Sequence, residues 1–524
     1  MAKKNIVIVA IGSKGDVVPF VQLALEINQH AGAKATIVTH DLYQPLVEAR
    51  GVAFRGLGID VGTARWTEEG ELAANAGMCS KDKLTKAWFD PLLQDWFNKV
   101  HAVVREITAT AEPTTMVFNT WAAVSMPTLC EKYQLAFTVA HLMPYFPTGA
   151  HGPCLGGDGS SLVATRLKWS LNDRRIYESR YAAHVAHTRG ALGLPPLPPN
   201  NKAGYAEYVQ TQETPVIMGY SAQLRPRAGD WPANVQVVGE LGRTRTAKTF
   251  DTGVEAPTAP EPGQERTAAA LGGNEALHAF LAATDEDPKG GRPVYIGLGS
   301  MMGYAFDAPR RRALVEALLN AVVVAGCRAV LQTTGFEEEI PVDAPGGAPG
   351  ATAYTNSEVF QLRGEEVPHD ALFPRCSLVV CHGGAGTVHA ALYAQCPVVT
   401  LPCLPDETDQ AFWGMTLFKR RVSPNAGVHA HSIKTGGRLG RAIQKALGDQ
   451  ELYIAAAVVS RGMKEEGGAT AAAAAIVAHA EKEASSSSSI SHVAGTPMFL
   501  AAAGGGGGAA AKTAAQADAA AMGQ

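Results

Sequence analysis

The run Cys381-His382-Gly383-Gly384-Ala385-Gly386-Thr387 combines residue types that suit an anion site. It follows an apolar stretch, 377–381, that is predicted to form a strand, and it precedes a helix-compatible stretch, 388–395. Glycines let the backbone approach a diphosphate, while the free N–H groups and the dipole at a helix N-terminus favour its negative charge. Thr387 adds a hydroxyl donor. A phosphate-bearing ligand is the first hypothesis, and a turn that is glycine-rich only for packing is the alternative.

The elements around this run follow an α/β rhythm in both halves of the chain. Apolar and β-branched runs predict strands at 5–11, 35–39, 115–119, 136–140 and 216–220, and again at 294–298, 329–332, 377–381 and 398–401. Helical patterns lie between them, as at 17–29. We expect two irregular regions, 62–96 and 144–199, and insertions of this kind often carry substrate contacts.

The length of 524 residues exceeds what one core usually supports, so two α/β domains are expected. We place an N-terminal domain at 1–241 and a C-terminal domain at 291–483. The segment 242–290 is rich in Thr, Ala, Pro, Gly and charge and is the predicted linker, with a helix-compatible stretch at 274–283. After residue 483, runs of serine, glycine and alanine predict a disordered low-complexity tail, 484–524.

Composition excludes several classes of function. A formal charge of −4 provides no basic field for nucleic acid. The eight cysteines form no C-x-x-C pair and no zinc-like spacing with histidine, which favours a reduced cytoplasmic setting. The N-terminus has too short an apolar run for a signal peptide, and no apolar stretch approaches the length of a spanning helix. The triplet Asp285-Glu286-Asp287 is interpreted as a solvated acidic turn rather than a metal site.

Seven segments together resemble the sterol 3β-glucosyltransferase group of the UDP-glycosyltransferases, which is also similar to the bacterial antibiotic glycosyltransferases. In chain order they are residues 12–17 (GSKGDV), 143–148 (MPYFPT), 231–235 (WPANV), 293–301 (PVYIGLGSM), 367–370 (VPHD), 382–387 (HGGAGT) and 409–414 (DQAFWG). Each segment alone is weak evidence, but their order and spacing are specific.

The resemblance implies an α/β fold of the GT-B type, with two Rossmann-like domains facing across a cleft and the last helices returning to the first domain. It implies an acceptor site in the N-terminal domain, a UDP-sugar site in the C-terminal domain, and an inverting reaction. The reaction would need no metal and no cofactor beyond UDP-glucose as the donor, since a helix N-terminus and neutral donors can stabilise the leaving UDP.

The resemblance makes Asp16 the candidate general base, at the turn after the first strand, where it would take the proton of an acceptor hydroxyl. The alternative is that Asp16 is a helix N-cap whose pKa is lowered by the helix dipole. His141, which follows a predicted strand, is the rival base, although a single histidine there is more often an acceptor-pocket or core residue.

In the donor site, the resemblance assigns the diphosphate to His382, Gly384, Gly386 and Thr387. Ser300 is a further phosphate contact, with an ordinary turn serine as the alternative.

Two residues are predicted to contact the nucleotide part of the donor. The backbone of Val367 would pair with the uracil edge, and His369 is a pocket-wall candidate or a surface residue. Two positions depart from the family pattern here: Cys381 replaces a first histidine, and Ala371 replaces a tryptophan.

Asp409 and Gln410 match the acid-amide pair that reads sugar hydroxyls in the family, because a carboxylate accepts while an amide both donates and accepts. Asp409 lies seven positions after Pro402, which indicates an insertion and leaves Asp406 as a rival.

His141, Met143 and Tyr145 are the predicted acceptor contacts. Aromatic residues also gather in one insertion, where they indicate either an acceptor tunnel, a face that touches lipid, or core packing. They are Trp66, Trp88, Phe89, Trp96 and Phe97.

The function predicted from these features is transfer of glucose from UDP-glucose to the hydroxyl of a sterol or similar lipophilic alcohol. The protein is expected in the cytoplasm, and contact with a membrane surface is left open. The alternatives are a glycosyltransferase acting on a polyketide or terpenoid metabolite, and a catalytically inactive nucleotide-sugar-binding protein. A dinucleotide oxidoreductase is disfavoured, because no full G-x-G-x-x-G with an acidic ribose ligand occurs.

Overall fold

The fold is taken from a computed structural model, which describes most of the chain up to residue 489. The described residues are 4–60, 83–110, 112–154, 169, 181–197, 214–242, 271, 273–286, 291–299, 302, 305–332, 358–362, 367–404 and 408–489. Trp66, Ser300, Asp406 and the predicted tail from residue 490 onward lie outside them.

The first half forms a parallel sheet with the strand order β3-β2-β1-β4-β5-β6-β7. The strands are β1 Lys4–Val9, β2 Ala33–Thr39, β3 Ala53–Gly56, β4 Thr114–Asn119, β5 Ala136–His141, β6 Val216–Met218 and β7 Val235–Val237. The strand order reverses between β1 and β4, so a crevice opens beyond their carboxyl ends. Residues 6–9 of β1 are completely buried, as expected for a strand covered by helices on both faces.

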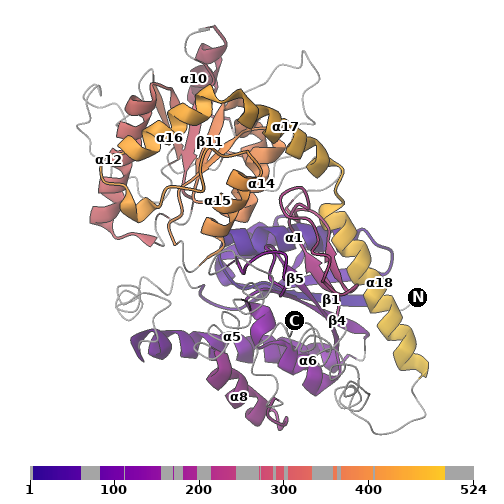
Figure 1. The fold of residues 1–524 in the computed structure, drawn as a ribbon. Helices are drawn as coiled ribbons and strands as arrows, with labels where there is room; N and C mark the ends of the chain where they lie inside the picture. Colours follow the sequence, from indigo (N-terminus) through magenta and orange to yellow (C-terminus); the bar gives the residue numbers. More distant parts are fainter. Residues whose placement is uncertain are drawn as a thin grey trace, which may run out of the picture.

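The second half forms a smaller parallel sheet with the order β10-β9-β8-β11-β12. Its strands are β8 Val294–Gly297, β9 Ala329–Gln332, β10 Val359–Leu362, β11 Leu378–Cys381 and β12 Val398–Thr400. Its order reverses between β8 and β11, which places the turn after Cys381 at the switch point of this sheet. Figure 1 shows the two sheets in different parts of the molecule, with the first in indigo to magenta and the second in salmon to orange.

Helices cover both faces of each sheet. In the first half they are α1 Lys14–Asn28, α2 Gln44–Glu48, α5 Lys83–Thr108, α6 Pro127–Tyr133 and α8 Ala182–Ala191. In the second half they are α10 Glu275–Glu286, α12 Ala308–Ala325, α13 His369–Leu372, α14 Ala385–Tyr393, α15 Gln410–Lys419, α16 Gly437–Gly448, α17 Gln450–Lys464 and α18 Gly468–Ser489. No described helix is long and apolar enough to span a bilayer.

One buried cluster runs through both halves. It joins Val7 and Val9 of the first sheet to Val379 and Cys381 of the second, and the contact between them includes Trp413. A second cluster packs α12 and α16 on the other face of the second sheet. Because the first cluster is continuous, the two sheets share hydrophobic surface instead of being joined by the linker alone.

Helix α18 returns from the C-terminal half to the first domain, where it lies along α1 (Figure 1). Ala473 and Ile476 belong to the same buried cluster as Ile6 and Phe20, and the Thr470 hydroxyl donates to Glu26 Oε2 at 2.9 Å. The helix continues past residue 484, where the tail is predicted to begin, and ends at Ser489.

The expected strands of both halves are present, but the regions expected to be irregular are partly helical. Helix α5 begins at Lys83, inside the region 62–96, and α8 lies inside 144–199. The side chains of Trp96 and Phe97 are core residues, 1% and 3% exposed, so core packing is the correct alternative for these two. Trp88 and Phe89 lie on α5, and their side chains are outside the described residues. The expected acidic turn begins inside α10, which contains Asp285 and Glu286.

Replacing Ile476 of α18 with alanine should destabilise the protein by roughly 2–5 kcal/mol, because it leaves a cavity between α18 and the first sheet. The matched control is Val458→Ala on α17, where the side chain is 60% exposed and the change should stay within about 0.5 kcal/mol. Urea unfolding followed by circular dichroism measures both. Equal effects of the two changes would contradict the docking of α18.

Candidate functional site

Asp16 lies in the first turn of α1, immediately beyond the carboxyl end of β1. The helix begins at Lys14 and Ser13 is its N-cap, so Asp16 is the third helical residue and not the N-cap. Its Oδ2 accepts from the Ser13 N–H at 2.9 Å and the Ser13 hydroxyl at 2.8 Å, while Oδ1 accepts from Trp121 Nε1 at 3.3 Å. Burial raises the pKa of Asp16, and these hydrogen bonds oppose the rise without cancelling it. The lowered pKa expected for a capping aspartate is therefore wrong.

The turn that carries Asp16 is fixed by its neighbours. Gly12 has φ +132°, and a side chain there would overlap the Asp16 carboxylate. Asn119, at the end of β4, donates from Nδ2 to the Ile11 carbonyl at 2.7 Å and accepts from the Ile11 N–H at 3.2 Å. His40, after β2, accepts the Gly12 N–H on Nε2 at 3.1 Å, so its proton is on Nδ1.

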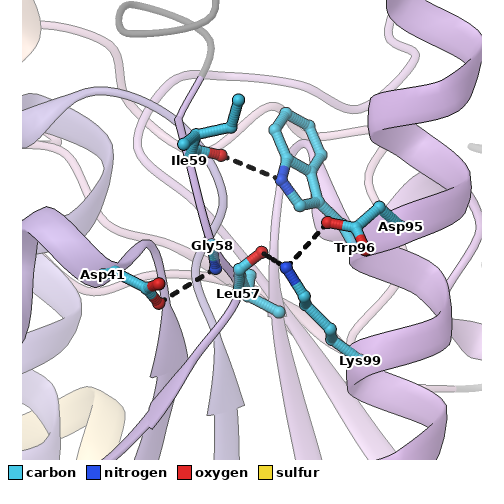
Figure 2. A network of polar contacts seen from close by, with 7 residues as sticks. All are labelled: Asp41, Leu57, Gly58, Ile59, Asp95, Trp96 and Lys99. Carbon is cyan, nitrogen blue, oxygen red and sulfur yellow. Dashed lines mark hydrogen bonds and ion pairs between the residues drawn. The ribbon is translucent and has the colours of Figure 1, made fainter.

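A polar network ties the segment after β3 to Asp41 and to helix α5 (Figure 2). The Gly58 N–H donates to Asp41 Oδ1 at 2.9 Å, and Trp96 Nε1 donates to the Ile59 carbonyl at 3.1 Å. Lys99 bridges α5 to this segment, since Nζ donates to the Leu57 carbonyl at 3.1 Å and to Asp95 at 2.7 Å. The Trp96 ring lies edge-on to the His40 ring, with centroids 5.0 Å apart. The network therefore holds the surroundings of His40, which is hydrogen-bonded to the turn that carries Asp16.

The predicted acceptor residues lie at and beyond the end of β5. His141 is buried, and its Nδ1 lies 3.0 Å from the Thr120 hydroxyl. Burial lowers the pKa of His141 to about 3. Met143 is buried, and Tyr145 is half-buried with its ring 5.4 Å from that of His141. A base role for His141 gains no support, since a buried group with so low a pKa is a weak proton acceptor.

The predicted anion site lies at the start of α14. Gly384 is the N-cap, and the first intrahelical bond is donated by Val388 to the Gly384 carbonyl at 3.0 Å. Within the described part of the chain, the backbone N–H groups of Ala385, Gly386 and Thr387 donate to no protein acceptor. A Cβ at Gly386 would meet no atom within 4 Å. The first turn of α14 thus has three N–H groups without an acceptor among the described residues, at the positive end of a helix and with open space beside Gly386.

His382 lies over this helix start. A Cβ at Gly384 would overlap His382 Nε2, and one at Gly299, the second residue after β8, would lie 3.7 Å from Cε1 of the same ring. The Nδ1 atom of His382 is buried and has no hydrogen-bond partner among the described residues. Burial, with a smaller effect from His369, lowers the pKa of His382 to about 4. The ring is therefore neutral at physiological pH and offers one N–H donor.

The other predicted nucleotide contacts lie near the same strand ends. His369 begins α13 and stacks on Phe373 with ring centroids 4.4 Å apart, and Val367 is buried. Their contact with a nucleotide remains a prediction, as does the role of Ser300, which lies outside the described residues.

Asp409 caps the start of α15 and faces the first domain. Its Oδ2 accepts from Trp413 Nε1 at 2.6 Å. Burial raises the pKa of Asp409 to about 6, and the Asp16 carboxylate adds to the rise. The two carboxylates are thus close enough to repel each other, although they come from different halves of the chain.

Gln410 is buried, and its Oε1 accepts from the Cys403 N–H at 2.8 Å and the Leu404 N–H at 3.2 Å. The side-chain oxygen therefore fixes the loop after β12, and only the Nε2 group remains as a donor for a sugar. Sequence reasoning gave Gln410 a binding role alone and missed this structural one.

The segment after β6, residues 220–225, connects the two halves. The Ser221 N–H donates to His389 Nε2 on α14 at 3.0 Å, and the Ser221 hydroxyl donates to Glu466 at 2.9 Å. Arg420, the C-cap residue that follows α15, donates from Nε to the Leu224 carbonyl at 2.9 Å. None of these residues was identified from the sequence. The only signal was the strand predicted at 216–220, which ends where this segment begins.

With this geometry, the start of α14 can bind an anion, Asp409 can accept hydrogen bonds from hydroxyl groups, and Asp16 can accept a proton. No group of three or more His, Cys, Asp or Glu side chains in the described ranges is arranged to hold a metal ion.

Comparison with known proteins identifies glycosyltransferases as similar. The chain is 25% identical over 469 residues to a sterol 3-beta-glucosyltransferase of Cryptococcus neoformans var. neoformans, covering 88% of this chain and 26% of that protein. It is 27% identical over 435 residues to a sterol 3-beta-glucosyltransferase of Arabidopsis thaliana, covering 80% and 59%. A vancomycin aglycone glucosyltransferase of Amycolatopsis orientalis is 28% identical over 308 residues, covering 58% and 61%. The chain thus spans about a quarter of the fungal relative and under two thirds of the other two.

Solved structures agree on the fold. The calicheamicin glycosyltransferase CalG4 aligns with a TM-score of 0.60 at 15% identity, covering 92% of this chain and 99% of that one. The glycosyltransferase of kitacinnamycin aligns with a TM-score of 0.57 at 14% identity, covering 91% and 98%. No protein-family model matches the chain. The predicted similarity to UDP-glycosyltransferases and the predicted α/β fold of the GT-B type are confirmed.

The stability of the fold should fall as the pH falls from 6.5 towards 4. Burial lowers the pKa values of His40, His184 and His389 to about 4 and that of His141 to about 3, from an ordinary value of 6.5. Between these pH values the unfolded chain binds more protons than the folded one, so folding is disfavoured. Each such imidazole costs roughly 2 kcal/mol by about pH 5. The raised pKa values of three carboxyl groups, Asp16, Asp409 and Glu466, act in the opposite direction, but they are fewer than the five histidines, His382 included, whose pKa values are lowered to about 4 or below.

Urea unfolding at about pH 7.5, 6 and 5 measures this dependence, and we expect a loss of several kcal/mol. A flat profile would show that these histidines are accessible to protons in the folded state.

Proposed function

We propose that this protein is a glycosyltransferase that moves glucose from UDP-glucose onto the hydroxyl of a sterol or similar lipophilic alcohol, with inversion and without a metal. The observation that carries the proposal is the set of three N–H groups at the start of α14 that have no acceptor among the described residues and lie beside a neutral histidine, with open space at Gly386. Similarity to sterol 3-beta-glucosyltransferases supports the choice of acceptor.

In the proposed reaction the acceptor oxygen attacks the anomeric carbon of the sugar. Its proton passes to Asp16, whose raised pKa makes it a stronger base than an exposed aspartate. The bond from the anomeric carbon to the diphosphate oxygen breaks, and UDP leaves with the electron pair.

The negative charge that develops on UDP is stabilised by the N–H groups of Ala385, Gly386 and Thr387 and by the positive end of α14. The neutral His382 donates one further hydrogen bond. Asp409 accepts hydrogen bonds from the sugar hydroxyls. Without the sugar, this carboxylate interacts unfavourably with the like charge of Asp16, so a bound hexose supplies donors that stabilise it.

A second acceptor class, polyketide and other secondary-metabolite aglycones, is favoured by the similarity to vancomycin aglycone glucosyltransferase. Purified protein incubated with UDP-glucose, a chelator and a mixture of sterols and aglycones separates these possibilities by product mass. A hexosylated sterol is the expected product. UDP-glucose binding without any product would instead identify a catalytically inactive binding protein, and product only with a divalent ion would refute the metal-free mechanism.

Replacing Asp16 with asparagine should lower kcat by about 10²- to 10⁴-fold, because the amide cannot accept the proton. The amide oxygen of the new side chain can still accept from the Ser13 N–H and hydroxyl, while the bond from Trp121 is lost because the amide NH2 takes the other position. The turn should therefore persist, and the Kd for UDP should stay unchanged. Wild-type kcat should fall as the pH falls through the raised pKa of Asp16, where the base becomes protonated. A near-normal kcat for the asparagine variant would remove Asp16 as the base.

Replacing Gly386 with alanine should raise helix stability by up to about 1 kcal/mol, since the new Cβ meets no protein atom and alanine is the better helix former. The same methyl group should weaken UDP binding, because it occupies the space assigned to the diphosphate. The control is Gly448→Ala at the end of α16, where a Cβ also meets nothing within 4 Å. Calorimetric titration with UDP should show weakened binding only for the first variant, and equal affinities would place the diphosphate elsewhere.

A further inference from the structure

A buried set of three rings lies where segment 220–225 meets α14 and α15. We call it the anchor cluster, and it consists of Tyr220, His389 and Trp413. All three side chains are fully buried. The Trp413 ring is edge-on to both others, with centroids 5.4 Å from His389 and 5.9 Å from Tyr220. Tyr220 comes from the first half of the chain, so the cluster spans both domains.

Trp413 makes two hydrogen bonds to Asp409. Its indole Nε1 donates to Asp409 Oδ2 at 2.6 Å, and its backbone N–H donates to the Asp409 carbonyl at 2.9 Å. The indole has no room to turn, because His389 and Tyr220 pack on it and it is fully buried. One carboxylate oxygen of Asp409 is therefore held in place, and the other keeps a fixed direction.

His389 connects the same cluster to α14. Its Nδ1–H donates to the Ala385 carbonyl at 2.6 Å, and its Nε2 accepts the Ser221 N–H at 3.0 Å. Only the neutral Nδ1–H tautomer satisfies both bonds, and burial, which lowers the pKa of His389 to about 4, keeps the ring in that form. Ala385 is the first residue of the helix whose N–H groups are assigned to the diphosphate.

We propose that Trp413 is the positioning residue of Asp409. The anchor cluster holds both the sugar-binding carboxylate and the diphosphate-binding helix in fixed positions relative to the first domain. The proposal rests on the proposed function, because it assigns the sugar to Asp409. It adds residues that do not touch the donor themselves and act through Asp409 and α14.

The first test needs no ligand. With the seven tryptophans labelled at the indole nitrogen, the signal lost in Trp413→Phe is that of Trp413. In ligand-free protein this N–H signal should shift with a midpoint near pH 6, following Asp409, and should cease to do so in Asp409→Asn. Among the described residues, the groups that interact electrostatically with Asp409 are Asp16 and the Cys154 thiol. A signal that ignores pH, or that still titrates in Asp409→Asn, overturns the proposal.

The second test measures binding. Trp413→Phe keeps an aromatic ring but removes the N–H donor, so the Kd for UDP-glucose should rise about tenfold while the Kd for UDP stays within about twofold. The matched control is Trp231→Phe. Trp231 is also buried among aromatic rings near the domain contact, but its indole N–H has no acceptor among the described residues. This control should bind both ligands like the wild type.

A double-mutant cycle separates positioning from packing. In the Asp409→Asn background, adding Trp413→Phe should change the Kd for UDP-glucose by less than about twofold. A purely structural role for Trp413 predicts the same loss in both backgrounds, with UDP weakened as well, and that result overturns the proposal. Failure of wild-type protein to bind any UDP-sugar would refute the proposed function instead, and the ligand-free titration would still decide whether Trp413 holds Asp409.

His389→Phe tests the other connection. It keeps a ring in the cluster but removes both hydrogen bonds, so the first turn of α14 loses its tie to Ser221. The Kd values for UDP and UDP-glucose should rise together, by about tenfold, unlike the selective effect at Trp413. Thermal unfolding of each variant identifies global destabilisation. A folded variant with unchanged affinity for both ligands would remove His389 from the proposal.

Discussion

The N–H groups at the start of α14 are the constraint on which the candidate site depends. A helix N-terminus leaves these donors unpaired, and proteins usually supply a side-chain cap, which Gly384 cannot provide. The backbone can reach this state because Gly383 adopts φ +91°, where a side chain would also press on the Gln410 carbonyl. The site therefore keeps donors available at a cost to local stability that the surrounding core must offset.

The two carboxylates at the domain contact add a second unfavourable element. Asp16 and Asp409 each have a raised pKa, and each carboxylate is held by an indole N–H, from Trp121 and Trp413 respectively. Indole donates without accepting, so it stabilises the charged form and cannot take the proton. The hexose of the proposed donor would suit this arrangement, because its hydroxyl groups supply hydrogen-bond donors to carboxylates of like charge.

The sequence predicted the α/β rhythm and the glycine turn because short apolar runs and a glycine-rich strand-to-helix turn are local signals. It also located Asp16 and Asp409, through their motifs. It missed Trp121, His389 and Trp413 as supporting residues. For two of them the partner is distant in the chain: Trp121 and Asp16 are 105 positions apart, and His389 and Ser221 are 168 apart. The helical character of 83–96 was obscured by the polar and aromatic mixture of that stretch.

The arrangement of the domains follows from the same long-range contacts. Segment 220–225 is bonded to α14, to the end of α15 and to Glu466, and it is part of a core cluster that continues through both sheets. Breaking these contacts would expose apolar surface and leave His389 without its donor, so they hold the two halves together on this side. The same core cluster contains Val9 of β1 and Cys381 of β11, so these contacts also fix the ends of those two strands relative to each other. In the proposed function, the position of a donor at α14 relative to Asp16 would depend on contacts that neither the donor nor Asp16 makes directly.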